Sequence, residues 1–265
     1  MATILDGRVL AERIRQKVKM MIADLPVKPG MTAILVGDDP ASHLYVSLKE
    51  KACAEVGIHF EKLIYPAEVP QEELIKKINE LNKRDDIHGI LVQLPLPNQS
   101  ADAVVAAINP NKDIDGFHPE NLRRLEAGEP GLVPPVALGI MKLIDTGRHQ
   151  NRTAAIIASE IFARPLKALL KEQQIEFVNN SQQADILIVA VGKPKSITAD
   201  QVKPGAIVID VGTTKTPDGL VGDVDFEAVT KVAGAITPVP GGVGPATVAM
   251  LTLNVVKAAI LNKRR

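Results

Sequence analysis

Tyr45 and Lys49 are the first pair in this sequence whose types and spacing suggest chemistry; they stand four residues apart in "ASHLYVSLKEKACAEVG". This segment has the apolar pattern of a helix that ends at Gly57, so both side chains project from one helix face. A lysine beside an aromatic ring in a partly dry site loses its charge easily and can act as an acid or a base. The same spacing also fits a solvated lysine whose stem packs on the ring, which is the usual state of a helical lysine.

Gln93 is the second candidate, because it interrupts an apolar strand, "GILVQLPLP" at 89–97. The prolines end the strand soon after Gln93, which places it near the carboxyl edge. A buried amide needs partners, so Gln93 either satisfies backbone groups or faces a ligand at the strand end.

An acidic turn supplies the third candidate, with Asp113, Asp115 and Gly116 inside "NPNKDIDGFHPEN". Such turns often cap their own backbone. The functional alternative is a carboxylate that accepts hydrogen bonds from paired N–H donors on a heterocycle. A divalent-metal loop is not favoured, because the alternating ligands stop after two.

Two further segments have the form of ligand-binding turns. In "TPVPGGVGPATVAML", Gly241, Gly242 and Gly244 precede a helix that begins near Pro245, and free N–H groups at a helix start can hold a ligand. A plain glycine-rich connection is the alternative. In "IVAVGKPKSI", Gly192 follows an apolar strand, as in a turn over a bound ligand.

A strand–turn–helix at "TAAIIASEIFARPLKALL" raises the question of a nucleotide site. Residues 154–158 read as a buried strand, and Pro165 suits the first turn of a helix. The turn between them, 159–164, contains no glycine and carries a carboxylate, Glu160.

The elements that must position these residues alternate along the chain. Apolar runs that read as strands lie at 31–37, 59–65, 89–97, 154–158, 175–178, 184–191, 206–211 and 235–237. Helical patterns follow Asp6, fill the segment of Tyr45, follow Pro70 and begin near Pro245. This alternation predicts an α/β fold with parallel sheets covered on both faces. A loop-like, Pro/Gly-rich stretch at 117–135 separates two domains.

The composition sets the broad class of protein. A chain of 265 residues with 46% hydrophobic residues can build a core, and a net charge of zero argues against nucleic-acid or membrane-surface partners. The single cysteine, Cys53, excludes an internal disulfide and fits a reducing cytoplasm. We expect no signal peptide and no membrane span.

Six strings taken together resemble the methylenetetrahydrofolate dehydrogenase/cyclohydrolase family. They are "VGDDPASHLYVSLKEKACAEVGI", "HGILVQLPLP", "KDIDGFHPENLRRLEAGEPG", "KPGAIVIDVG", "LVGDVDF" and "ITPVPGGVGPATVAML". The resemblance covers nearly the whole chain, in order.

The resemblance implies a fold, a reaction and a setting. It implies a folate-binding catalytic domain at 1–136 and 244–265, with a returning C-terminal helix, and a Rossmann-like dinucleotide-binding domain at 137–243. A hydride passes from 5,10-methylenetetrahydrofolate to NADP, and the resulting methenyl cation is hydrolysed to 10-formyltetrahydrofolate. The family is usually a cytoplasmic homodimer in one-carbon metabolism.

The resemblance also assigns roles to single residues. Lys49 matches the lysine of the cyclohydrolase step, Gln93 the glutamine that holds and tunes it, and Asp115 the aspartate that binds the pterin ring. Tyr45 matches the tyrosine that packs over the folate. The loop that shapes the folate pocket is matched by Pro240, Gly241, Gly242 and Val243.

The cofactor segments depart from the family pattern. Where Gly-Arg-Ser is usual, the chain has Ala158, Ser159 and Glu160, and Arg164 stands where a lysine is usual. Loss of that arginine removes a contact to the 2′-phosphate of NADP worth roughly 1.5–3 kcal/mol. NAD is less favoured still, because Asn179 and Asn180 stand where NAD binding needs an acid. The predicted cofactor residues are Ser159, Glu160, Arg164, Gly192, Val211, Gly212 and Thr213.

These departures leave three hypotheses. The chain is a bifunctional enzyme with an altered NADP site, a cyclohydrolase whose dehydrogenase activity is weak or lost, or a non-catalytic folate-binding paralogue. The Lys49–Gln93–Asp115 set argues against the third, because binding alone does not need the lysine.

Overall fold

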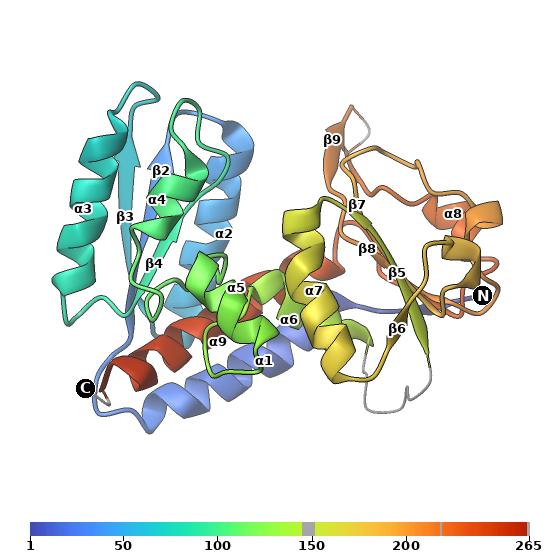
Figure 1. The fold of residues 1–265 in the computed structure, drawn as a ribbon, viewed down its shortest axis with the longest axis horizontal. Helices are drawn as coiled ribbons and strands as arrows, with labels where there is room; N and C mark the ends of the chain where they lie inside the picture. Colours follow the sequence, from blue (N-terminus) through green and yellow to red (C-terminus); the bar gives the residue numbers. More distant parts are fainter. Residues whose placement is uncertain (145–151, 218, 264–265) are drawn as a thin grey trace. The chain divides into compact units, whose positions relative to one another are not determined.

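The computed structural model describes residues 1–144, 152–217 and 219–263 of an α/β chain that divides into two compact units (Figure 1). The six-stranded unit comprises Met1–Ala11 and Val136–Thr247, and the three-stranded unit comprises Glu12–Pro135 and Val248–Arg265. The predicted domains, 1–136 with 244–265 and 137–243, stay a prediction. The predicted domain bounds place 1–11 and 244–247 elsewhere, whereas here the first residues join the six-stranded unit because β1 (Thr3–Ile4) pairs with β11 (Ala235–Ile236).

The sheet of the three-stranded unit is parallel and has β2 (Gly30–Val36) at its centre. β3 (His59–Tyr65) pairs on one side and β4 (Gly89–Val92) on the other. All seven residues of β2 are buried, which explains their unbroken apolar run. β4 ends before the predicted strand does, so Gln93 directly follows it. The prolines beyond lack the N–H that a strand ladder needs.

The helices along residues 7–126 are α1 Gly7–Ala23, α2 Pro40–Val56, α3 Gln71–Lys83, α4 Ala101–Ala106 and α5 Pro119–Glu126. Of these, α2 packs against β2 and β3. The predicted start and stop signals are confirmed, because Asp6 accepts a hydrogen bond from Arg8 N (2.8 Å) and Gly57 ends α2 with a φ of 88°.

Helix α5 corrects the prediction of a loop over 117–135. It is short, begins at a proline and is capped by the His118 ring. Glu120 pairs with Arg123 and Arg124, and the leucines of α5 are buried. Local ion pairs and two buried leucines thus form a helix in a stretch whose glycines and prolines suggest none.

The sheet of the six-stranded unit is parallel throughout, in the order β1-β11-β8-β7-β5-β6. The remaining strands are β5 Thr153–Ala158, β6 Glu176–Phe177, β7 Ile186–Ala190 and β8 Ile207–Asp210. The chain passes from β5 to β6 on one side and then to β7 on the other (Figure 1). The order therefore reverses between β5 and β7, the position where open α/β sheets bind ligands outside their carboxyl ends.

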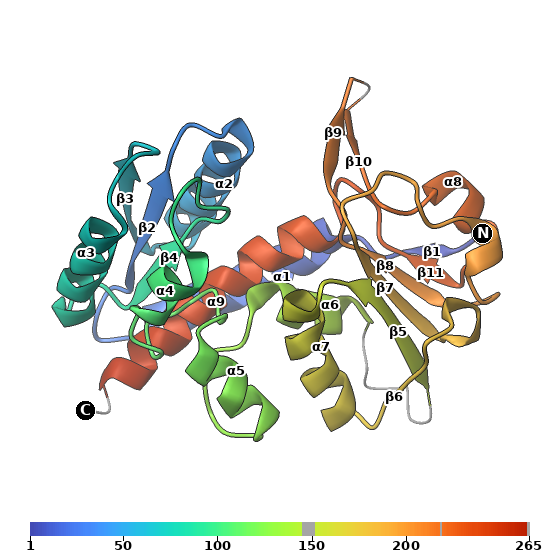
Figure 2. The same cartoon turned by 45° about the horizontal axis from the view of Figure 1, so that its top comes forward.

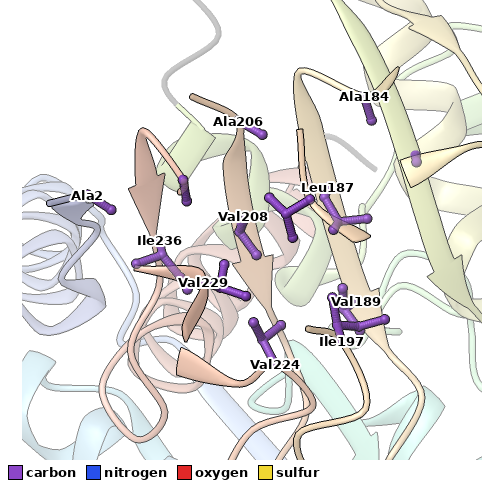
Figure 3. Close-up of a cluster of buried hydrophobic side chains, with 13 residues drawn as sticks. Ala2, Ala184, Leu187, Val189, Ile197, Ala206, Val208, Val224, Val229 and Ile236 are labelled. Atoms are coloured by element: carbon purple, nitrogen blue, oxygen red, sulfur yellow. The ribbon is translucent and has the colours of Figure 1, made fainter. Parts of the chain in front are cut away.

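Apolar side chains on both faces of this sheet are buried. Ile186 and Ile188 of β7 join one core with α6 (Pro135–Ile144) and α7 (Glu160–Glu172). The alternate residues Leu187 and Val189 join a second core on the opposite face, with Val208 of β8 and Ile236 of β11 (Figure 3). Burial on both faces accounts for strands without polar alternation.

Three features of this unit were not predicted. β9 (Thr214–Thr216) and β10 (Gly219–Val221) form an antiparallel hairpin that extends from the unit (Figure 2). Short helical turns lie at Ser181–Gln183, Ala199–Gln201 and in α8, Phe226–Val229. Pro165 lies inside α7 and not in its first turn, because the helix already begins at Glu160.

Helix α9 (Val243–Lys263) contradicts the expectation that no apolar run is long enough to span a membrane. Residues 243–262 pass that test by length and composition, yet 61% of the apolar stretch is buried inside the protein. A core helix has this same character.

Candidate functional site

Lys49 and Gln93 meet at the carboxyl edge of the three-stranded sheet. Lys49, on α2, donates from Nζ to Gln93 Oε1 at 2.8 Å. Gln93 directly follows β4, where its backbone N–H donates to Ile34 O and its Nε2 donates to Leu94 O, each at 2.8 Å. The amide is thus fixed by backbone on one side and accepts from the lysine on the other.

Burial lowers the pKa of the Lys49 ammonium, and the nearby carboxylate of Asp115 acts against this by raising it. Burial likewise raises the pKa of Asp115, while Lys49 lowers it. The surroundings therefore bring the lysine closer to the neutral amine that can accept a proton. Cys53, one turn further along α2, has a pKa raised to about 12 by burial and stays a thiol.

Tyr45 lies one turn before Lys49 on α2, and 37% of it is exposed. A phenol ring left open beside a half-buried lysine is available to a flat ligand. The structure thus brings together Tyr45, Lys49, Gln93 and Asp115 in one unit.

The loop that carries Asp115 is fixed from within by Asp113. Asp113 accepts hydrogen bonds from Gly116 N (3.2 Å), His118 N (2.8 Å) and Asn121 Nδ2 (3.0 Å). The self-capping reading of the acidic turn is therefore correct for Asp113, while Asp115 is left to face the lysine. Burial raises the pKa of Asp113 to about 6.

Lys112, within the same loop, and Asn254, on α9, tie the loop to neighbouring segments. Lys112 Nζ donates to the carbonyls of Leu81 (3.2 Å) and Arg84 (2.6 Å) at the end of α3. Asn254, on α9, donates from Nδ2 to the carbonyls of Ile114 (2.9 Å) and Val133 (2.8 Å). The lysine stands in the quoted "NPNKDIDG", but no local pattern marks Asn254.

The predicted folate loop, Pro240 to Val243, belongs to the six-stranded unit. Gly241 has a φ of 116°, and its carbonyl accepts from Gly7 N at 2.9 Å. A Cβ on Gly242 would lie 2.7 Å from the carbonyl oxygen of Pro238. Glycine is therefore required here by conformation and by close packing.

The first predicted cofactor residues surround the start of α7. Ser159 is the N-cap of that helix but its side chain makes no capping hydrogen bond. Glu160 is the first helical residue, and its carboxylate pairs with Lys167 Nζ at 2.8 and 3.0 Å. Arg164 lies in the helix itself. A first turn without a side-chain cap leaves backbone N–H groups for an anion.

The remaining cofactor residues follow the two neighbouring strands. Gly192 comes after β7, has a φ of 68°, and has open space where a Cβ would stand. Val211, Gly212 and Thr213 come directly after β8. Because β8, β7 and β5 are adjacent and parallel, all seven predicted residues belong to segments at or just beyond one edge of the sheet.

Two buried aspartates beneath this edge were missed as functional candidates. Asp223 accepts from Val191 N (2.6 Å) and Gly192 N (3.0 Å), and Asp210 accepts from Gly212 N (3.0 Å). Their signal was present in the quoted "VIDVG" and "LVGDVDF". Within the described ranges, no group of three or more His, Cys, Asp or Glu side chains is placed to hold a metal ion.

Two family models cover most of the chain. Residues 5–115 match the catalytic domain of tetrahydrofolate dehydrogenase/cyclohydrolase, and residues 134–263 match its NAD(P)-binding domain. The first match contains Tyr45, Lys49, Gln93 and Asp115, and the second contains the seven predicted cofactor residues.

Individual relatives agree with the models. The chain is 46% identical over 278 residues, 97% of each chain, to a protein of Dechloromonas aromatica named bifunctional protein FolD. A crystal structure of the FolD methylenetetrahydrofolate dehydrogenase/cyclohydrolase of Campylobacter jejuni is 40% identical with a TM-score of 0.93, covering 99% of this chain and 100% of that one.

A Trypanosoma brucei dehydrogenase-cyclohydrolase, solved with NADP and an inhibitor, is 32% identical with a TM-score of 0.93, covering 100% of this chain and 99% of that one. The sites, the family models and the relatives lead to one conclusion: this chain belongs to the tetrahydrofolate dehydrogenase/cyclohydrolase family.

Proposed function

We propose that the protein is a bifunctional 5,10-methylenetetrahydrofolate dehydrogenase and 5,10-methenyltetrahydrofolate cyclohydrolase that uses NADP. The hydrogen bond from Lys49 to Gln93 is the observation that carries this proposal, because it places a lysine of lowered pKa at a sheet edge next to a carboxylate. Family membership and the NADP-bound relative support the substrate and the cofactor.

In the hydrolytic step Lys49 accepts a proton. A water oxygen attacks the methenyl carbon, and one of its protons passes to the Lys49 amine. The bond from that carbon to the ring nitrogen N5 then breaks as the hydroxyl becomes the formyl C=O, and the second water proton ends on N5. Gln93 holds the amine in place and Asp115 binds the pterin ring. Tyr45 packs over the folate.

Both activities proceed through a cation on the folate. Burial lowers the pKa of Lys49 and so reduces its repulsion of that cation, and the Asp115 carboxylate favours the cation. One folate site can therefore serve the oxidation and the hydrolysis.

The edge of the six-stranded sheet has the form that a dinucleotide needs. Backbone N–H groups at the start of α7 suit phosphate, and the open space at Gly192 lets a ligand approach the chain closely. The segment of Ser159, Glu160 and Arg164 and the segment of Val211, Gly212 and Thr213 would flank it. When bound there, NADP supplies the acceptor for the hydride.

The altered turn after β5 does not by itself imply loss of the dehydrogenase. Glu160 is paired with Lys167, so part of its negative charge is compensated within α7. The family and its bifunctional members favour the full activity over a cyclohydrolase alone or a non-catalytic paralogue. We further propose a cytoplasmic homodimer without nucleic-acid or membrane partners, on the basis of the family and the neutral net charge.

Two assays test the proposal. The purified chain receives methylenetetrahydrofolate with NADP or NAD, and the reduced cofactor is followed at 340 nm. Separately it receives methenyltetrahydrofolate, whose disappearance is followed. We expect both reactions, with NADP preferred. Fast hydrolysis without reduced cofactor would leave a cyclohydrolase, and folate binding without either reaction would leave a binding protein.

A further inference from the structure

Two buried carboxylates lie beneath the predicted dinucleotide edge of the six-stranded sheet, and neither has a part in the chemistry proposed above. Asp223 is fully buried and Asp210 is 3% exposed. Asp210 ends β8, while Asp223 lies beyond the β9–β10 hairpin.

Asp223 binds the backbone that follows β7. Its Oδ2 accepts from Val191 N at 2.6 Å and from Gly192 N at 3.0 Å. Asp210 extends the same network after β8, since its Oδ1 accepts from Gly212 N and from Asp223 N, each at 3.0 Å. The two carboxylates therefore connect the chain after β7 to the chain after β8.

The fit between these carboxylates and the backbone depends on two glycines. A Cβ on Gly212 would lie 2.2 Å from Asp223 Cγ, and a Cβ on Gly222 would lie 1.9 Å from Asp210 Oδ2. No side chain fits at either position unless a carboxylate moves.

The core fixes Asp223 from its other side. Val224 and Ile197 are buried in the apolar cluster beside Val189 (Figure 3). Ile197 N donates to Asp223 O at 3.0 Å, and Val224 N donates to Asp210 Oδ2 at 3.0 Å. The carboxylate of Asp223 thus has little freedom to move away from Gly192.

Burial of the Asp210 and Asp223 carboxylates costs free energy of folding. Asp223 Oδ1 is buried and finds no hydrogen-bond partner within the described part of the chain. Burial, with the nearby Asp223 also contributing, raises the pKa of Asp210 to about 6. Buried carboxylate oxygens are normally hydrogen-bonded, so the fit of Asp223 is set by its Oδ2 contacts to the chain after β7.

We propose that Asp223 is a positioning residue for the dinucleotide: it holds Val191–Gly192 by hydrogen bonds and, packed against Gly212, sets the spacing that the cofactor requires at this sheet edge. The inference rests on the proposed function, because it assigns a dinucleotide to that edge. Asp223 acts through the backbone and does not touch the reacting atoms.

The test compares Asp223→Ala and Asp223→Asn in the full-length chain. The measurements are NADPH binding by the fluorescence of its nicotinamide ring, the KM for NADP, and hydrolysis of methenyltetrahydrofolate, which needs no dinucleotide. In Asp223→Ala we expect the NADPH Kd and the KM for NADP to rise at least tenfold, while hydrolysis stays within twofold. Asp223→Asn keeps an oxygen for Val191 and Gly192, so we expect a smaller rise.

Asp225→Ala is the matched control. The Asp225 side chain caps α8 by accepting from Ala228 N, while its backbone N–H donates to Ile197 O and is kept in the variant. The variant loses one partly buried hydrogen bond two residues away from Asp223. We expect its KM for NADP to stay within twofold. If Asp223→Ala does not fold, Gly212→Ala tests the same contact by pushing a methyl group against the Asp223 carboxylate.

Three results would overturn the inference. One is an unchanged NADPH Kd in Asp223→Ala or Gly212→Ala. Another is an equal loss of hydrolysis and of NADPH binding in both Asp223 variants, which marks a folding role only. The third is a wild-type chain that binds no NADPH, which also removes the dehydrogenase half of the proposed function. A wild type that reduces NADP beside variants of unchanged KM removes the inference alone.

Discussion

The carboxyl edges of the two sheets differ in the groups that they offer to a ligand, which are side chains at one edge and backbone at the other. At the edge of the three-stranded sheet, reactive side chains face one another, and Lys49 is held by Gln93 beside Asp115. At the edge of the six-stranded sheet, backbone and glycine are presented, and the carboxylates of Asp210 and Asp223 are buried underneath. Side-chain chemistry tolerates few replacements, whereas a backbone site can keep its shape when exposed side chains such as Ser159 change.

The largest effect is expected at the lysine. Lys49→Ala removes the only proton acceptor that we assign to hydrolysis, and a positioned acid–base group contributes about 10²–10⁴-fold to a rate. We expect methenyltetrahydrofolate hydrolysis to fall by that factor, measured by the loss of its absorbance. Lys51→Ala, at an exposed lysine of the same helix, is the control. Substantial hydrolysis in Lys49→Ala would exclude the proton-transfer role.

A stability measurement addresses the loop under Asp115. A carboxyl whose pKa rises from 3.8 to about 6 on folding stabilises the protein fully below pH 4 and loses that contribution as the pH rises through 6, for a total of about 3 kcal/mol. We expect the advantage of the wild type over Asp113→Asn in free energy of unfolding to be smaller at pH 7 than at pH 4.5.

Urea titrations at the two pH values give this comparison. Asp24→Asn, at an exposed residue just after α1, is the control for a general effect of pH. An advantage that grows between pH 4.5 and pH 7 would mean that Asp113 is stabilised as the carboxylate.

A substitution at the predicted dinucleotide edge is expected to strengthen NADP binding. Ser159→Arg introduces a cation where the resemblance implies one, and a charge-assisted contact to phosphate of roughly 1.5–3 kcal/mol predicts a KM for NADP lower by about tenfold to 150-fold. Because NAD lacks the 2′-phosphate, its KM provides the internal control. An equal change for both dinucleotides would show that position 159 does not face the phosphate.

The smallest effect is a displacement of the pH profile of hydrolysis. Gln93→Glu puts a negative charge on the oxygen that accepts from Lys49, which raises the pKa of the lysine and moves the rising limb of the rate to higher pH. Asp115→Asn removes a charge that raises this pKa, so its limb moves to lower pH. Profiles of kcat from pH 5 to pH 10 measure both, and displacements in the same direction would contradict the assignment.

Contacts that follow from short-range pattern could be read from the sequence, and contacts between distant segments could not. The helix of Tyr45 and Lys49 ends at Gly57 as expected, and the polar residue after an apolar strand, Gln93, lies at a sheet edge. Asn254 binds Ile114 O from 140 positions away, and no periodicity announces such a partner. Helix α5 was missed because its ion pairs outweigh a composition that is typical of loops.

The roles that depend on ligands stay predictions for a different reason. The geometry places Ser159, Glu160 and Thr213 in segments near the carboxyl edge of one sheet, but which of them contacts a dinucleotide depends on the ligand itself. No local pattern assigns a role to Asp223, because its contact to Gly192 appears only in three dimensions.

Neither unit is a continuous stretch of chain, and this determines when each can fold during synthesis. β1, at residues 3 and 4, waits for β11 at residues 235 and 236, and the loop of Asp115 waits for Asn254 near the end of the last helix. A growing chain meets its first residues long before the partners that complete them. A chain cut short before residue 254 would therefore contain Lys49, Gln93 and Asp115, but the loop of Asp115 would lack the hydrogen bonds from Asn254.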